Sequence, residues 1–252
     1  MRIFMRAALV CATVILAYSG VSASAETKVG SNIDSRVVLA FQVEESKVAE
    51  MLPEGWAPLT LPKGPFAGSN LLMMFADRHL AMDPEGKPVP AHSTRFAALL
   101  AYGVSPEVKG ARMFVTQTYE LPPVASAYGN GIAASVDRTF GLEGEGAGPR
   151  TQRETWTVAA ENGETFNLDL TYERGRMSWS SSEATPYSAA NPDFYRIYRY
   201  EQMVDLIMSN ALERKLNGEI SFTASGHSAF DGTEVIQAAI VIPVYVREVS
   251  LP

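Results

Sequence analysis

The chain has 252 residues, 46% of them hydrophobic, and a formal net charge of −7. A chain of this length can bury a substantial core in one large domain. Its acidic balance, with no cluster of lysines or arginines, argues against nucleic acids and anionic membrane surfaces as partners.

The first 25 residues have the pattern of a secretory signal peptide. Arg2 and Arg6 precede an uncharged apolar stretch over 7–18, and the small residues of 23–25 are typical of a cleavage site before Glu26. The stretch is shorter than the roughly 20 residues of a spanning helix, which favours a cleaved signal over a membrane anchor. We therefore expect a periplasmic or secreted protein, cleaved after Ala25.

Cleavage after Ala25 changes the charge and the cysteine content. Without Arg2 and Arg6, 19 basic residues face 28 acidic ones, a net charge of −9 over 227 residues. Without Cys11, the mature protein has no disulfide, no thiol nucleophile and no cysteine-ligated metal. We expect no membrane insertion after cleavage and no cofactor; a homo-oligomer remains open.

The predicted mature domain begins with a leader and a strand. Residues 26–35 have no clear pattern and are interpreted as a loose leader. We expect a single β-barrel domain over 36–252, because no linker or repeat divides it. The apolar run 36–43 predicts the first strand, and 44–51 predicts a short helix that Pro53 and the residues after it end. Further strands are predicted over 70–75, 94–102 and 112–121.

A hairpin is the clearest local signal. Asn162-Gly163 separates the strands predicted over 153–160 and 165–172, and Asn-Gly is the preferred two-residue hairpin turn because both positions need positive φ. This turn places Trp156 opposite Asp169 on one face. The other face carries the leucines and aromatic residues of the second strand, and we expect it to be core.

A helix and two strands are predicted for the rest of the chain. Residues 200–215 contain an apolar stripe at helical spacing and end in Arg214-Lys215, which suits a helix C-terminus. The final strands are predicted over 219–224 and 235–249, the second with Pro243, which indicates an edge strand or a bulge. The predicted fold class is mainly β (α+β), a closed or nearly closed barrel with one packing helix.

Six segments follow one another in a recognisable order: Arg36-Val37-Val38-Leu39-Ala40-Phe41, Met51-Leu52-Pro53-Glu54-Gly55, Val108-Lys109-Gly110 before 113–119, the run 123–132, Phe230-Asp231-Gly232 and Ile240-Val241-Ile242-Pro243. In their order and spacing the chain resembles the acetoacetate decarboxylase-like superfamily over most of the mature length. That resemblance implies a β-barrel or cone around a mostly apolar pocket.

The residues that carry the chemistry of the decarboxylases are missing. In those enzymes Gly-Arg-Glu is followed by two adjacent lysines, one of which forms a Schiff base while the other lowers its pKa. Here Gly129-Asn130-Gly131 takes the place of that motif, and Asp137 and Arg138 fall roughly where the lysines belong. The chain has no lysine between Lys109 and Lys215. An arginine stays protonated and forms no imine, so the resemblance carries over the fold but not the mechanism.

Three arginines are candidates for ligand binding. Arg36, close to the position of a family arginine, could bind a carboxylate through its bidentate fork or form a surface ion pair. Arg138 and Asp137 could face the pocket mouth or pair with neighbouring charges. Arg95, inside an apolar strand, points either inward to a partner or outward.

The remaining candidates are apolar or acidic. Met73 and Trp156, with Met74, Phe75 and Trp179, could surround a cavity or belong to the ordinary core. Asp169, Glu154 or Glu120 could serve as a general base if burial raised its pKa. The three histidines show no ligand spacing, so no metal site is predicted.

These observations predict an exported protein that binds a small, partly apolar carboxylate or keto compound, without Schiff-base decarboxylase activity. A lysine-independent enzyme on the same fold, with hydratase, lyase or aldol-type chemistry at a carbonyl, is the alternative. A lipocalin-like carrier is a third, and it would be an up-and-down barrel with a C-terminal helix outside it.

Overall fold

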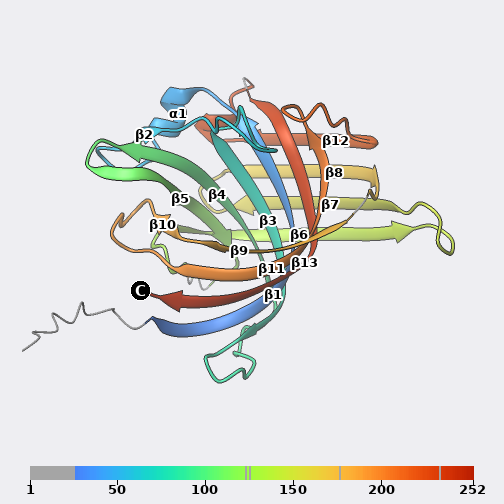
Figure 1. The fold of residues 1–252 in the computed structure, drawn as a ribbon, viewed down its shortest axis with the longest axis horizontal. Coiled ribbons are helices and arrows are strands. Elements are labelled where there is room, and N and C mark those ends of the chain that lie inside the picture. The colour runs from blue at the N-terminus through green and yellow to red at the C-terminus, as the bar shows by residue number, and fades with distance from the viewer. Residues whose placement is uncertain (1–25, 123, 125, 176, 233) are drawn as a thin grey trace, which may run out of the picture.

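The computed structural model describes residues 26–122, 124, 126–175, 177–232 and 234–252, so the predicted signal peptide lies outside the described residues. The fold is dominated by strands (Figure 1). Its described helices are α1 (Glu45–Ala49) and a short 3-10 helix, Ser228–Phe230. The strands are β1 (Thr27–Gln42), β2 (Ala57–Pro58), β3 (Leu71–Met82), β4 (Thr94–Ser105), β5 (Val108–Glu120), β6 (Gly131–Glu143), β7 (Thr151–Ala160), β8 (Thr165–Glu173), β9 (Ser178–Ala184), β10 (Pro186–Ser188), β11 (Ile197–Ser209), β12 (Gly218–Ser225) and β13 (Val235–Leu251).

The strands follow one path and divide into two layers. The order is β12-β8-β7-β6-β5-β4-β3-β1-β13-β11-β9, and β5 meets β6 through only three residue pairs. Strands β6, β7, β8 and β12 form a flatter layer, while the others curve strongly (Figure 1). Strand β9 pairs with β11, β10 pairs with β5, and a single residue separates β9 from β10. This segment therefore closes the curved strands into a cone.

Alternate residues of the curved strands face two different interiors, as strand geometry requires. On β1, Val37, Leu39 and Phe41 belong to the large core between the cone and the flat layer. Val38 and Ala40 point to the inside of the cone and belong to a smaller apolar cluster. The two faces of β1 and β3 thus carry different side-chain sets. No helix among the described residues is long and apolar enough to cross a membrane.

Pro243 lies in a bulge of a central strand. The register of β13 slips beside it against both neighbours: Ile242 and Tyr245 oppose Arg36 and Asp34 of β1, and the pairing with β11 shifts at the same level. Proline has no N–H to give to the ladder, so a bulge accommodates it inside a sheet. The predicted bulge is confirmed, and β13 is not an edge strand.

The predicted leader is wrong, because 26–35 is almost entirely strand. Thr27 pairs with Leu251, and the pairing continues along β13. The segment lacks apolar alternation because its inward side chains are polar: Asn32 and Asp34 are buried and bonded to arginines. A buried polar cluster has no signature in a hydrophobicity pattern.

The predicted helix over 200–215 is also wrong. Residues 197–209 form β11, and a turn follows in which Glu213 has a φ of 53°. Strand β11 lies between β13 and β9, and apolar residues stand on both of its faces. A strand with both faces partly covered loses the period of two, and its apolar run is then easily mistaken for a helical stripe.

The hairpin exists, but its register is one residue away from the prediction. Gly163 has a φ of 91° and its N–H donates to the Ala160 carbonyl, so the loop is longer than two residues. Trp156 therefore pairs with Leu168, not with Asp169. A slip of one residue exchanges the two faces. Trp156 shares the buried face with Leu168, and Asp169 is exposed.

Candidate ligand-binding cavity

A cavity of about 390 Å³ lies inside the cone. Its walls come from β1, β3, β4, β5, β11 and β13, together with residues 126–128 and the β9–β10 segment. Small-molecule pockets have volumes of this order. One part of the lining is apolar: Val38, Phe66, Leu72, Met74, Leu100, Met113, Ile240 and Ile242.

The polar end of the cavity is organised around the buried carboxylate of Asp34. The two oxygens of this carboxylate accept hydrogen bonds from Arg36 Nη2 at 2.6 Å, Arg36 Nε at 3.2 Å and Asn32 Nδ2 at 2.6 Å. Arg78 Nε lies 3.7 Å from Asp34 Oδ1. Burial raises the pKa of Asp34, but the guanidiniums of Arg36, Arg247 and Arg78 outweigh it and hold that pKa below its ordinary value. Asp34 is therefore a fixed anion.

Aromatic rings stand between the arginines. The Arg36 guanidinium lies 3.5 Å from the ring centre of Tyr245, and that of Arg247 lies 4.0 Å from the ring centre of Tyr198. Arg247 Nε donates to Asn32 Oδ1 at 2.8 Å. The hydroxyls of Tyr198 and Tyr128 are hydrogen-bonded to each other. The contacts form a row from Arg36 to Tyr128 along one wall.

The cavity wall carries more guanidiniums than carboxyl groups. Arg36, Arg78, Arg196 and Arg247 line it, against the carboxyl groups of Glu120 in the wall and Asp34 beside it. Burial, together with the guanidiniums of Arg247 and Arg36, lowers the pKa of Arg78 in spite of Asp34. Among the residues that the structure describes, Arg78 Nε and Arg196 Nε are buried without a hydrogen-bond partner. Buried donors are nearly always paired with a protein group or with ordered water.

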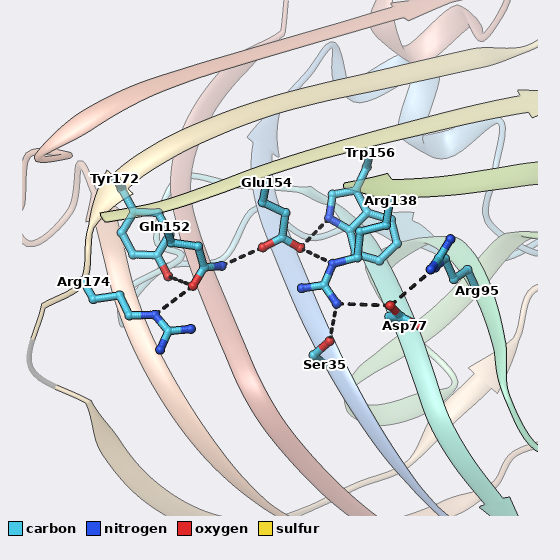
Figure 2. A network of polar contacts seen from close by, with 9 residues as sticks. All are labelled: Ser35, Asp77, Arg95, Arg138, Gln152, Glu154, Trp156, Tyr172 and Arg174. Atoms are coloured by element: carbon cyan, nitrogen blue, oxygen red, sulfur yellow. Dashed lines mark hydrogen bonds and ion pairs between the residues drawn. The ribbon is translucent and has the colours of Figure 1, made fainter. Parts of the chain in front are cut away.

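A second polar network fills the space between the cone and the flat layer (Figure 2). The buried carboxylate of Glu154 accepts from Arg138 Nε at 2.8 Å, Trp156 Nε1 at 2.7 Å and Gln152 Nε2 at 2.7 Å. Arg138 Nη1 also donates to Ser35 Oγ at 2.7 Å and Asp77 Oδ2 at 3.2 Å. Each of these groups has partners within the protein, so the network is structural.

The structure places one of the seven predicted site residues, Arg36, in the cavity wall. Arg138 and Trp156 belong to the network between the layers, and Arg95 Nε meets Asp77 Oδ2 there at 3.4 Å. Met73 is in the core between the layers, and its neighbour Met74 lines the cavity instead. Asp137 and Asp169 are exposed on the flat layer and cannot act in the cavity.

The sequence reasoning missed most of the polar end. Its missed members are Arg78, Arg196, Arg247, Tyr128, Tyr198 and Tyr245. The signal that singled out Arg95, an arginine inside an apolar strand, applies equally to Arg247 in β13. Of the two general-base candidates besides Asp169, Glu120 lines the cavity and Glu154 does not. Among the described residues, no three His, Cys, Asp or Glu side chains gather in a way that could hold a metal ion.

Comparison with known proteins identifies the fold. No protein-family model matches the sequence, and no curated protein sequence matches it. An enduracididine biosynthesis enzyme, MppR, complexed with pyruvate superposes with a TM-score of 0.53 at 13% identity, over 97% of this chain and 96% of MppR. An acetoacetate decarboxylase-like enzyme from Sphingomonas wittichii RW1 gives 0.54 at 11% identity, over 89% and 92% of the two chains. The chain thus has the predicted acetoacetate decarboxylase-like fold, and such likeness concerns the fold alone.

Proposed function

We propose that this is an exported protein that binds a small, partly apolar carboxylate or keto compound inside the cone, without Schiff-base decarboxylase activity. The observation that carries the proposal is the presence of four arginines in the wall of a cavity that also has a large apolar lining. A carboxylate there would accept charge-assisted hydrogen bonds, and the apolar walls would bury the body of the ligand at about 0.8 kcal/mol per methylene group.

Export is supported by the sequence features of the first 25 residues. The structure is compatible with cleavage after Ala25, since β1 begins at Thr27 and would be left whole. The side chain of Glu26 accepts from Arg199 Nη1 at 2.6 Å and Nη2 at 2.8 Å, so the new N-terminal residue would be bonded to β11.

Titration with octanoate tests the binding proposal. We expect octanoate to bind the wild type and the Arg78→Gln variant to bind it about 10- to 150-fold more weakly, the loss of a hydrogen bond to a charged group worth about 1.5–3 kcal/mol. Arg95→Gln is the matched control, because Arg95 is on the adjacent strand but on the opposite face. Isothermal titration calorimetry measures all three. Equal affinities of wild type and Arg78→Gln would contradict the proposal.

The absence of Schiff-base chemistry can be tested separately. The chain has six lysines, all among the described residues, and none of them lines the cavity. Borohydride reduction in the presence of pyruvate or acetoacetate should therefore leave the intact mass unchanged. A Schiff-base aldolase treated in parallel provides the positive control. A single trapped adduct at one lysine would overturn this part of the proposal.

A lysine-independent enzyme remains the second candidate function. Glu120 lines the cavity, and burial raises the pKa of the Tyr128 phenol, which keeps it protonated as a donor to a carbonyl oxygen. The solved structures with this fold that were compared above are enzymes. Proton NMR of keto and hydroxy acids incubated with the protein separates the two functions, because a binding protein returns its ligand unchanged.

A further inference from the structure

The polar end of the cavity extends along a wall, and its two extremes have different neighbours. This inference rests on the proposed function and specifies the ligand. We propose that the ligand carries two separate anionic groups on one apolar body, rather than a single carboxylate. The first group would lie beside Arg36 and Arg78, and the second beside Arg196.

The distribution of the arginines carries the proposal. Arg36 and Arg78 surround Asp34 at one extreme. From there the wall continues through the ring of Tyr245, over which Arg36 lies, then through Arg247, which lies over Tyr198. Tyr198 is bonded to Tyr128, and the charge of Arg196 acts on the phenol of Tyr128. The register gives the separation: Gln202 of β11 is level with Tyr245 and Asp34, and Arg196 comes six residues before Gln202, about 20 Å along the strand direction.

The unused hydrogen-bond donors lie at both extremes. Arg78 Nε is beside Asp34 without a hydrogen bond, and Arg196 Nε, two residues before Tyr198 in the chain, also has none, within the described part of the chain. The Tyr128–Tyr198 pair adds a further donor, because two phenols have two hydrogens and their mutual bond uses one. One carboxylate beside Arg78 would leave the donors near Tyr128 without an acceptor.

The charge balance leads to the same conclusion. Two carboxyl groups, those of Asp34 and Glu120, stand against the four guanidiniums of Arg36, Arg78, Arg196 and Arg247. Uncompensated charge in a low-dielectric interior is costly. A ligand with two negative charges compensates more of this excess than one with a single charge. A cavity of about 390 Å³ also leaves room for an apolar body against Leu72 and Ile240.

The predicted ligand class is therefore a dicarboxylate whose two carboxylates are joined by an apolar chain, or a compound of the same charge pattern. Three probes distinguish this class from related ligands. Octanedioate carries a carboxylate at each end of its chain, octanoate is a chain of the same length with one carboxylate, and octylphosphonate places its charge on a single centre.

The test is to titrate all three probes into the wild type and three variants. We expect octanedioate to bind the wild type at least about tenfold more tightly than octanoate, since a hydrogen bond to a charged group contributes about 1.5–3 kcal/mol. Arg196→Gln should weaken octanedioate binding more than octanoate binding and so remove most of this preference. Arg196→Lys should keep part of it, because the charge remains while the fork is lost. Arg199→Gln is the control, since Arg199 is exposed and bonded to Glu26. Circular dichroism melting curves establish that each variant is folded.

Three outcomes would overturn the inference. Equal affinity of the wild type for octanedioate and octanoate would leave the proposed function standing but remove the second anionic group. Octylphosphonate binding more tightly than octanedioate would indicate a single polyanionic head. If none of the three probes binds, the proposed function fails together with the inference.

Discussion

The Asp34→Asn variant should unfold with a free energy about 3–5 kcal/mol below that of the wild type, because it leaves buried positive charges without their counter-charge. Asparagine keeps the shape of aspartate, so the loss is electrostatic. Arg36 would lose the carboxylate that accepts its two hydrogen bonds. Arg78 and Arg247 would lose the negative charge that faces them. Urea unfolding at pH 7, followed by circular dichroism, measures the difference.

Asp137→Asn provides the matched control for this variant. Asp137 is exposed on β6, and its substitution should change the free energy of unfolding by no more than about 0.5 kcal/mol.

The effect of octanoate on the melting temperature of Asp34→Asn provides a second measurement. If the arginines bind carboxylates, octanoate should raise the melting temperature of Asp34→Asn more than that of the wild type, since it replaces the missing anion. An Asp34→Asn variant as stable as the wild type would show that the arginines are well solvated.

The contribution of Asp34 also has a defined pH dependence. Its pKa in the folded protein lies below the value of about 3.9 in the unfolded chain. A carboxyl with a lowered folded pKa stabilises the protein fully above its unfolded pKa, and this stabilisation disappears as the pH falls through the folded pKa. The difference in unfolding free energy between the wild type and Asp34→Asn should therefore be present at pH 7 and shrink below about pH 4.

The sequence predicts those parts of the fold in which one face of a strand is dry. The alternation in 153–172 gives the hairpin, and the apolar runs at 70–75 and 94–102 become β3 and β4. The sequence does not predict strands whose inward face is polar or whose two faces are both covered. The start of β1 directs Asn32 and Asp34 inward, and β11 has apolar residues on both faces.

The site was less predictable than the fold because it depends on register and on which face of a strand is inside the cone. Met73 and Met74 are equivalent in the sequence, yet one is in the core between the layers and the other lines the cavity. Arg95 and Arg78 come from paired strands and point to opposite sides. Only the closure of the cone through β9 and β10 determines which of these side chains line the cavity.

The Glu154→Gln variant should also lose about 3–5 kcal/mol of unfolding free energy, the effect of breaking a buried ion pair by removing one partner. Glu154 accepts three hydrogen bonds, and its loss leaves Arg138 with Asp77 as its remaining acidic partner. Glu143→Gln is the control in the same layer, because Glu143 forms an exposed ion pair with Arg153 and should contribute less than about 1 kcal/mol. Urea unfolding at pH 7 compares the two.

A double-mutant cycle with Arg138→Met decides whether the two side chains act as one unit. Because Arg138→Met removes the charge that Glu154 neutralises, the double variant should be more stable than the sum of the single losses predicts, by at least about 1 kcal/mol. Octanoate affinity should stay within about threefold of the wild type in every folded variant, since the network lies on the face of β1 opposite the cavity. A larger loss of affinity would mean that the network is coupled to the cavity. Ser35, which bonds to Arg138 and lies between Asp34 and Arg36 in the chain, is the residue through which such coupling would pass.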